Sequence, residues 1–415
     1  MSAFTRRNFL KAATIPAASL VSGCLGGDDP VHPIAEPISE WPSFRGDPAN
    51  TGYALGVEDT STDPDIEWTF STEDSIWASP VVSDDVLFIG SSDHSLYALD
   101  AGSGDFLWDV ETENRVEATP AVSDGTVVVG SFDRHVYGID AASGDIMWDI
   151  ETGGLIRSSA TIVDGTVYVG SGCHNLACEW YADGDVDETG VVYALDLETG
   201  DIEWEHPIED EVVSTPAVHD GSVYIGASNG VLYALDATEG DERWVYDDMD
   251  MIWGSPSFAY DTVYLGDWDG LIHAVDAGSG EDRWVFDTGG DYVSASTAVD
   301  DDYVFIGMTP ENQFGDTDIN RAELFAIERD TGEEAWAYET DALEIGSSPL
   351  VTDERVYFGT HAPSDAQGTG MLALTREGEL EWFFDADERG VGSSPALVDG
   401  MLYFGGTDGI VYALA

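Results

Sequence analysis

The residues best suited to chemistry are cysteines, a histidine and a short run of acids, all in one stretch of the chain. Cys173 and Cys178 are separated by four residues, and His174 follows the first of them. Two thiolates and one imidazole supply only three ligands where a structural zinc ion takes four, so a loop disulfide is the leading interpretation. The acids of residues 183–187 alternate as at the start of a calcium loop, but Glu188 stands where that loop needs glycine. We predict no metal site.

Acidic side chains dominate the composition. The 415 residues include 82 acidic and 14 basic side chains, which gives a formal net charge of −68. Nucleic-acid binding is excluded, because no basic surface is present to neutralise phosphates. The acids are spread among aromatic-rich apolar runs, which indicates a folded chain whose repulsion is screened by concentrated salt. We interpret the composition as that of an extreme halophile, a halophilic archaeon.

The N-terminus has the order of an export signal. Arg6 and Arg7 precede an apolar run that is too short to span a bilayer. The paired arginines indicate twin-arginine export, and the small residues before Cys24 resemble a lipobox, whose cysteine becomes lipidated. We expect residues 1–23 to be a signal and residues 24–40, rich in proline and acids, to be a stiff tether. The protein would then be extracytoplasmic and lipid-anchored to the outer face of the cell membrane.

The remainder of the chain repeats with a period near 40 residues. The unit at 116–148 holds four short β runs separated by Asp-Gly or Gly turns, and no helical periodicity is found. A period of 40 with four strands predicts a β-propeller. One tryptophan marks each repeat, and we expect all of them to be structural: Trp68, Trp108, Trp148, Trp204, Trp244, Trp284, Trp336 and Trp382.

The number of repeats predicts how the ring closes. The Ser/Thr-Pro motif of the first strand and the apolar motif of the third strand each occur eight times, with variants. The last repeat ends at Ala415 without a fourth strand, while residues 65–70 form a strand with no earlier partners. We therefore predict an all-β, eight-bladed propeller over residues 41–415. Its four-stranded antiparallel blades would be closed by residues 65–70 as the fourth strand of the last blade. We expect a monomeric ring.

The repeat resembles the tryptophan-docking repeat of the quinoprotein-type (PQQ-like) propellers. Its cleanest copy runs from Ala98 to Trp108, ALDAGSGDFLW, and the stretch Trp41–Gly52 resembles the segment that often precedes the first blade of that family. The resemblance implies that each tryptophan packs between adjacent blades beside a glycine. The enzymes of the family hold pyrroloquinoline quinone (PQQ) and calcium with an adjacent Cys-Cys pair and acidic and amide ligands. This chain has no Cys-Cys dipeptide, so we predict neither cofactor, because a fold does not imply its function.

The departures from the repeat are candidates for a binding site. Three insertions, near 171–191, 309–323 and 361–370, all fall between the second and third strands and so emerge on one face. The connections into each first strand open on that same face, where one residue per blade would form a channel mouth. We take Trp77, Glu117, Arg157 and Trp253 as the candidate ligand or partner site. The alternative is that the ring only fills the channel. The other four residues of this ring at the channel mouth are Val213, Ser294, Gly346 and Gly392.

Two functions remain open. The first is a non-catalytic, lipid-anchored propeller that acts as a binding or scaffold module for a protein, peptide or polymer. It resembles the BamB-type lipoproteins, the periplasmic outer-membrane assembly lipoproteins of bacteria. The alternative is a PQQ-dependent, quinoprotein-like dehydrogenase at the membrane surface.

Overall fold

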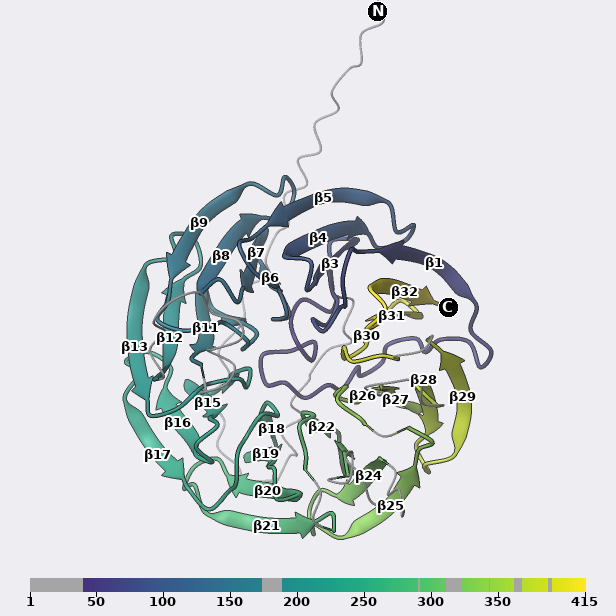
Figure 1. The fold of residues 1–415 in the computed structure, drawn as a ribbon. Coiled ribbons are helices and arrows are strands. Elements are labelled where there is room, and N and C mark those ends of the chain that lie inside the picture. The colour runs from purple at the N-terminus through teal and green to yellow at the C-terminus, as the bar shows by residue number, and fades with distance from the viewer. Residues whose placement is uncertain are drawn as a thin grey trace, which may run out of the picture. The chain divides into compact units, whose positions relative to one another are not determined.

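The predicted eight-bladed propeller is confirmed. The computed structural model describes residues 40–173, 189–289, 292–310, 322–342, 344–361, 368–386 and 390–415. In these residues thirty-two strands form eight four-stranded antiparallel sheets, arranged as blades around a central channel (Figure 1). No helix in this part of the chain is long and apolar enough to cross a membrane. The expected signal, with Arg6 and Arg7, and the tether from Cys24 to residue 39 lie outside the described residues.

Each blade runs from a short inner strand to a long outer strand. The strands of blades one to four are β2 (Val81–Ser83), β3 (Val86–Gly90), β4 (Ser95–Asp100) and β5 (Phe106–Glu111); β6 (Ala121–Ser123), β7 (Thr126–Gly130), β8 (His135–Asp140) and β9 (Ile146–Glu151); β10 (Thr161–Val163), β11 (Thr166–Ser171), β12 (Gly190–Asp196) and β13 (Ile202–Ile208); β14 (Ala217–His219), β15 (Ser222–Gly226), β16 (Leu232–Asp236) and β17 (Glu242–Tyr246). Those of blades five to eight are β18 (Ser257–Ala259), β19 (Thr262–Gly266), β20 (Leu271–Asp276) and β21 (Asp282–Asp287); β22 (Ala298–Val299), β23 (Tyr303–Met308), β24 (Glu323–Glu328) and β25 (Glu334–Glu339); β26 (Leu350–Val351), β27 (Arg355–Thr360), β28 (Gly370–Thr375) and β29 (Leu380–Asp385); β30 (Ala396–Val398), β31 (Met401–Gly405), β32 (Ile410–Leu414) and β1 (Ile66–Ser71).

Burial within a blade explains the sequence pattern. The second strand of blade two, TVVVG in β7, is buried on both faces because neighbouring blades cover it. The outer strand β9 buries mainly Trp148. The hairpin between β6 and β7 turns at Asp124 and Gly125, whose φ angles of 50° and 76° are the positive values of a tight β-hairpin turn. The Asp-Gly pairs of the sequence are thus hairpin turns.

A β-bulge precedes the tryptophan of every described blade. In blade one Ala98 pairs with Trp108 while the next residue, Leu99, pairs with Phe106, so Leu107 is the extra residue of the outer strand. The same register shift occurs in the other seven sheets that the structure describes. The bulge brings two consecutive side chains to the outer rim of each blade.

Tryptophan and glycine join neighbouring blades. The Trp108 indole of blade one lies on Gly144 of blade two, where an added Cβ would be 2.8 Å from the ring. Its Nε1–H donates to the Ala141 carbonyl at 3.1 Å. A flat apolar group therefore fits only where the next blade has no Cβ. In the described residues the joints of this kind are Trp68–Gly104, Trp108–Gly144, Trp148–Gly200, Trp204–Gly240, Trp244–Gly280, Trp284–Gly332 and Trp336–Gly378.

The eighth joint is built differently because blade eight contains both ends of the ring. Strand β1 pairs with β32, as predicted, with Trp68 opposite Ala413. Asp65 and Ala415 then exchange two backbone hydrogen bonds of 3.1 and 3.2 Å. Blade eight therefore has no turn between its third and fourth strands. Trp382 of blade seven is buried there, and its Nε1 has no hydrogen-bond partner among the described residues.

Residues 41–54, here called the axial segment, cross the channel (Figure 1, the purple trace at the centre). Their backbone carbonyls accept one N–H from the inner part of each of six blades, donated by Val82, Val122, Val218, Phe258, Val299 and Val351. Each of these residues lies three positions after the Ser/Thr of the Ser/Thr-Pro motif, about 10 Å further along the strand at 3.3 Å per residue. The axial segment thus closes the channel below the level of that motif.

Two polar side chains fix the axial segment at its centre. The Asn50 amide donates to the carbonyls of Thr215, Pro216 and Pro256 at 3.1–3.2 Å. Arg45 is buried and donates to the Thr297 carbonyl at 3.1 Å. Buried backbone carbonyls need partners. Two of these carbonyls also accept a hydroxyl from the inner strand of a neighbouring blade, Pro216 from Thr161 at 2.6 Å and Thr297 from Ser257 at 2.8 Å.

Candidate ligand site at the channel mouth

The structure brings all eight residues of the predicted ring to one cavity. The cavity has a volume of about 160 Å³ and opens on the face where each outer strand leads into the next blade. Phe44 of the axial segment and one Ser or Thr from every blade complete its lining. The ring members in contact with it are Trp77, Glu117, Arg157, Val213, Trp253, Ser294, Gly346 and Gly392.

A closed circle of hydrogen bonds lies just inside the ring. Each backbone N–H of the Ser/Thr-Pro motif donates to the hydroxyl of the same motif in the next blade; Thr119 donates to Ser159 at 3.0 Å, for example. The circle closes where Ser394 donates to Ser79, also at 3.0 Å. The eight residues, which we call the hydroxyl circle, are Ser79, Thr119, Ser159, Thr215, Ser255, Ser296, Ser348 and Ser394, with distances from 2.8 to 3.3 Å.

The hydroxyl circle gives the cavity its polarity. Every hydroxyl of the circle accepts one N–H, and in the described residues none of them donates its own proton to a protein group. All eight line the cavity. The floor therefore offers a ring of neutral O–H donors to water or to acceptor atoms of a ligand.

Arg157 is held in place at one side of the mouth. Its guanidinium lies 5.5 Å from the centre of the Phe132 ring and 5.7 Å from that of Trp253. The carboxylate of Glu211, which is 2% exposed, lies 3.7 Å from Nη1. Stacking against aromatic rings and a buried countercharge orient the guanidinium. The cation thus remains at the mouth, where its side chain is about one quarter exposed.

Glu117 is also engaged within the protein. Its carboxylate accepts a hydrogen bond from Ser92 at 3.1 Å and pairs with Arg115 at 3.3 Å. The two charges predicted for the mouth, Glu117 and Arg157, therefore each have a partner of opposite charge. The mouth is close to neutral in a chain whose net charge is −68.

The aromatic groups extend beyond the two predicted indoles. Trp77 is 40% exposed and meets the ring of His361 edge-on at 5.4 Å. His361 pairs with Glu344 at 2.6 Å. On the opposite side Trp253 contacts Trp268, with ring centres 4.6 Å apart. The mouth therefore carries an indole on each of two opposite sides.

The sequence interpretation missed Trp268, His361 and Glu344. The indole Nε1 of Trp268 and the Nδ1 of His361 are buried and have no hydrogen-bond partner among the described residues. His361 begins the third insertion, which was a signal that could have found it. Trp268 and Glu344 lie in connections of ordinary length, so only their spatial neighbours reveal them.

Under the mouth the axial segment carries two buried charged groups, Arg45 and Asp47. Burial lowers the pKa of the Arg45 guanidinium, and the nearby Asp47 carboxylate partly offsets this effect. Burial raises the pKa of Asp47, although hydrogen bonds from Thr51 and Ala49 oppose the rise. These groups hold the floor of the cavity and do not line it.

The remaining predicted site residues fall mainly outside the described part of the chain. Cys173 is buried and disulfide-bonded. Cys178 lies outside the described residues, so its pairing with Cys173 stays a prediction. Most of each insertion lies outside them as well. In the part of the chain that the structure describes, no group of three or more His, Cys, Asp or Glu side chains could hold a metal ion.

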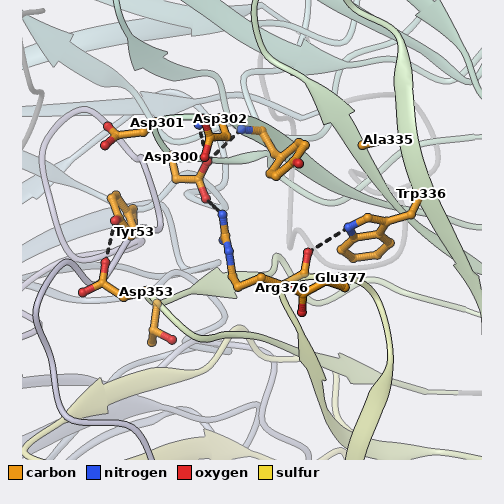
Figure 2. Close-up of a pocket in the computed structure, with 11 residues that line it drawn as sticks. Tyr53, Asp300, Asp301, Asp302, Ala335, Trp336, Asp353, Arg376 and Glu377 are labelled. Atoms are coloured by element: carbon orange, nitrogen blue, oxygen red, sulfur yellow. Dashed lines mark hydrogen bonds and ion pairs between the residues drawn. The ribbon is translucent and has the colours of Figure 1, made fainter.

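A second cavity, of about 580 Å³, lies between blades six and seven beside the axial segment. Figure 2 shows Arg376 paired with Asp300 and Tyr53 with Asp353. Asp300 also accepts the backbone N–H groups of Asp302 and Tyr303 at 2.8 and 2.7 Å. These carboxylates hold the turns and the axial segment together, so the acidic lining has a structural explanation.

The mouth does not fit the cofactors of the quinoprotein enzymes. Its volume of about 160 Å³ is below the 300 Å³ or more of usual cofactor and small-molecule sites. The acids around it, Glu117, Glu211 and Glu344, each pair with a basic side chain instead of forming a calcium ligand set. No reaction step through PQQ or calcium can therefore be assigned to these residues.

Comparisons with known proteins agree with the fold. The family model described as outer membrane protein assembly factor BamB matches residues 60–188, 182–285 and 268–415. BamB from Moraxella catarrhalis has 16% identity and a TM-score of 0.64, over 85% of this chain and 97% of that one. Quinohemoprotein alcohol dehydrogenase from Comamonas testosteroni has 17% identity and a TM-score of 0.73, over 92% and 81%. A europium-containing methanol dehydrogenase has 14% identity and a TM-score of 0.71, over 91% and 98%. No curated protein sequence matches the chain. At these identities the structural matches show the fold alone.

Proposed function

Because the chain belongs to the BamB family of repeat propellers, we propose that it is a binding or scaffold module whose mouth engages a protein, peptide or polymer. The proposal includes an extracytoplasmic location, with residues 1–23 as export signal and a lipid anchor on Cys24. The order of paired arginines, apolar run and lipobox-like cysteine supports that location.

One observation carries the proposal: the side chains that differ between blades gather at the mouth, above a channel that the axial segment closes. Elsewhere the blades are nearly equivalent in their joints and bulges. At the mouth one blade presents an indole, another a guanidinium and another only glycine. Such unequal side chains on a rigid frame are typical of a recognition surface.

The shape of the mouth favours a macromolecule over a small molecule. The cavity is small, about 160 Å³, and its lining includes the exposed Trp77. Tryptophan and arginine are the side chains that most often dominate protein–protein binding energy. The hydroxyl circle could satisfy backbone carbonyls of a loop inserted from the partner.

The proposal is tested with variants of the mouth. A photoreactive crosslinker at Ser294 identifies the partner, and binding is then measured with the purified partner. Trp77→Ala is expected to weaken binding about tenfold or more. Arg157→Met is combined with Glu211→Gln, so that no lone buried carboxylate remains, and is also expected to weaken binding. Val285→Ala, on the outer rim of blade five, is the control. The proposal is wrong if both mouth variants bind the partner as tightly as the control does.

The alternative, a PQQ-dependent dehydrogenase, is favoured only by the fold of the enzymes named above. Its test is separate. The purified protein is incubated with calcium and the quinone in concentrated salt, and the quinone spectrum and dye reduction with alcohols are recorded. A spectral change with substrate turnover would establish the enzyme, and the absence of both would remove it.

A further inference from the structure

Large apolar side chains are exposed on the outer rim of blades one and two. Phe106 and Leu107, at the start of β5, are 51% and 46% exposed. Ile146 and Met147, at the start of β9, are 47% and 45% exposed. Folded proteins rarely leave such side chains clustered in water without a use. We call these four residues the apolar rim.

The β-bulge explains why these side chains come in consecutive pairs. In a regular strand one of two neighbouring residues would face the blade. The bulge before each tryptophan turns both outward. The pairs can therefore be compared around the ring. Blades four and five carry charged pairs at this place, Glu242–Arg243 and Asp282–Arg283.

On both sides of blades one and two the outer pairs are mixed, with one apolar and one acidic member. In blade seven Leu380, which is 46% exposed, stands beside Glu381. Blade eight has Ile66 beside Glu67, and blade three has Ile202 beside Glu203. Ile66 and Ile202 are 50% and 47% exposed. The aromatic surface also continues between blades, because Phe70 of β1 stacks on Phe106 at 6.4 Å with 14° between the rings. Blades seven, eight, one, two and three thus each expose a large apolar side chain at this place, and only the apolar rim exposes two in each pair.

The chain leaves the propeller at the same blade. Trp41 pairs with Val82 of β2, and the Glu40 carboxylate accepts a hydrogen bond from Ser83 at 3.0 Å. From β2 to β5 is a distance of three strand spacings, about 14 Å. Fifteen residues lie between Cys24 and Glu40, and the sixteen steps along this chain span about 55 Å when it is extended. A bilayer that holds a lipid on Cys24 is therefore within reach of the apolar rim.

A second copy of the chain fits this surface less well. Two copies, each with a net charge of −68, repel one another. A stable dimer also needs about 800 Å² of interface per partner, which is more than four half-exposed side chains supply.

We propose that the apolar rim rests in the interface of the bilayer to which Cys24 is anchored; this inference relies on the proposed lipid anchor. Apolar side chains enter the headgroup boundary while the polar remainder stays in water. Acidic turns near the rim require screened or uncharged headgroups. The channel mouth would then face along the membrane surface.

The test uses the full chain with Cys24→Ser, which removes the lipid, and phosphatidylcholine vesicles in about 1 M salt, where the Debye length is about 3 Å. Phe106→Thr, Leu107→Thr, Ile146→Thr and Met147→Thr are introduced together. The fraction that floats with vesicles gives the partition coefficient, which we expect to fall at least about tenfold. The matched control is Val245→Thr with Val285→Thr, because these residues are 40% and 44% exposed on blades four and five.

An unchanged partition coefficient in the rim variant would overturn the inference, and so would an equal loss in the control variant. A dimer of the unsubstituted rim that is absent from the rim variant would assign the surface to a second copy instead. The lipid anchor is assessed separately, by membrane fractionation of cells that express the natural cysteine or Cys24→Ser. Equal membrane retention of both would contradict the anchor, while release of Cys24→Ser leaves the vesicle result to decide the rim.

Discussion

The joints between blades make a prediction that one matched pair of glycines can test. Gly144 and Gly125 both belong to blade two, and both have a φ of 76°. A Cβ on Gly144 would lie 2.8 Å from the Trp108 ring, whereas a Cβ on Gly125 would meet nothing within 4 Å. Gly144→Ala and Gly125→Ala therefore impose the same backbone strain, and only the first also strains a packed contact.

The magnitudes follow from this geometry. An L-residue with positive φ costs about 1–2 kcal/mol, and this cost applies to both variants. At Gly144 the Trp108 ring must withdraw by almost 1 Å to reach an ordinary contact of about 3.5–4.0 Å. Overpacking of this kind costs about 1–3 kcal/mol, and weakening of the 3.1 Å bond to Ala141 adds about 0.5–1.5 kcal/mol. We expect Gly144→Ala to be about 1.5–4.5 kcal/mol more destabilising than Gly125→Ala.

The assay is urea unfolding at constant salt, followed by tryptophan fluorescence. A double-mutant cycle with Trp108→Phe isolates the contact, because a smaller ring should reduce the cost of Gly144→Ala but leave that of Gly125→Ala unchanged. If Gly144→Ala and Gly125→Ala lower the free energy of unfolding equally, within about 0.5 kcal/mol, the joint is not a tight contact and the reasoning is refuted.

Two further predictions concern the axial segment. Asn50→Asp keeps the shape but replaces the donor to three carbonyls with a carboxylate; we expect a loss of about 3 kcal/mol or more in urea unfolding. The control is Asp84→Asn, in an exposed turn with a similar positive φ. If both substitutions lower the free energy of unfolding equally, the prediction is wrong. Burial raises the pKa of Asp47 above 3.8, so its contribution to stability is complete below that pH and is lost as pH rises through the folded pKa. As pH rises through the folded pKa, the Asp47→Asn variant should therefore become more stable relative to the natural protein. If the difference between their free energies of unfolding does not change with pH, this prediction is refuted.

The propeller was predictable because the same strand and turn pattern recurs eight times along the sequence. Turn residues, alternating strands and the tryptophan recur in each unit, so a single irregular copy does not obscure the pattern. The position of the strand at Trp68 was predictable for a related reason. No earlier strands preceded it to pair with, and the last repeat lacked a fourth strand. The ring of mouth residues followed by counting back from each proline. These inferences needed only position within a repeat.

The axial segment was not predictable in the same way. Asn50 and Arg45 contact residues 165 to 252 positions away, and hydrogen bonds of the segment's backbone join it to six blades. Backbone hydrogen bonds leave no side-chain pattern in the sequence. The resemblance of Trp41–Gly52 to a family segment located it before the first blade but did not show that it closes the channel. The hydroxyl circle escaped notice for a different reason, because its Ser and Thr residues were interpreted only as markers of the first strand.

The apolar rim was only partly predictable from the sequence. The residues before each tryptophan were visible in the sequence, but alternation predicts that only one of the two faces outward. The bulge in each outer strand changes this, and the pairs at Phe106 and Ile146 then stand out against the charged pairs at Glu242 and Asp282. The amino-acid types were therefore sufficient only after the register was known.

The propeller can bind a bilayer at the apolar rim and a partner at the mouth at the same time. The mouth opens along the channel axis, whereas Phe106 and Ile146 lie on the outer circumference, at right angles to that axis. A bilayer at the rim would therefore leave Trp77 and Arg157 uncovered, and a partner at the mouth would not displace the bilayer. The two surfaces should then act independently: rim substitutions should leave affinity for a soluble partner unchanged, and mouth substitutions should leave vesicle binding unchanged. Coupling between them would require an approach of the partner over blades one and two.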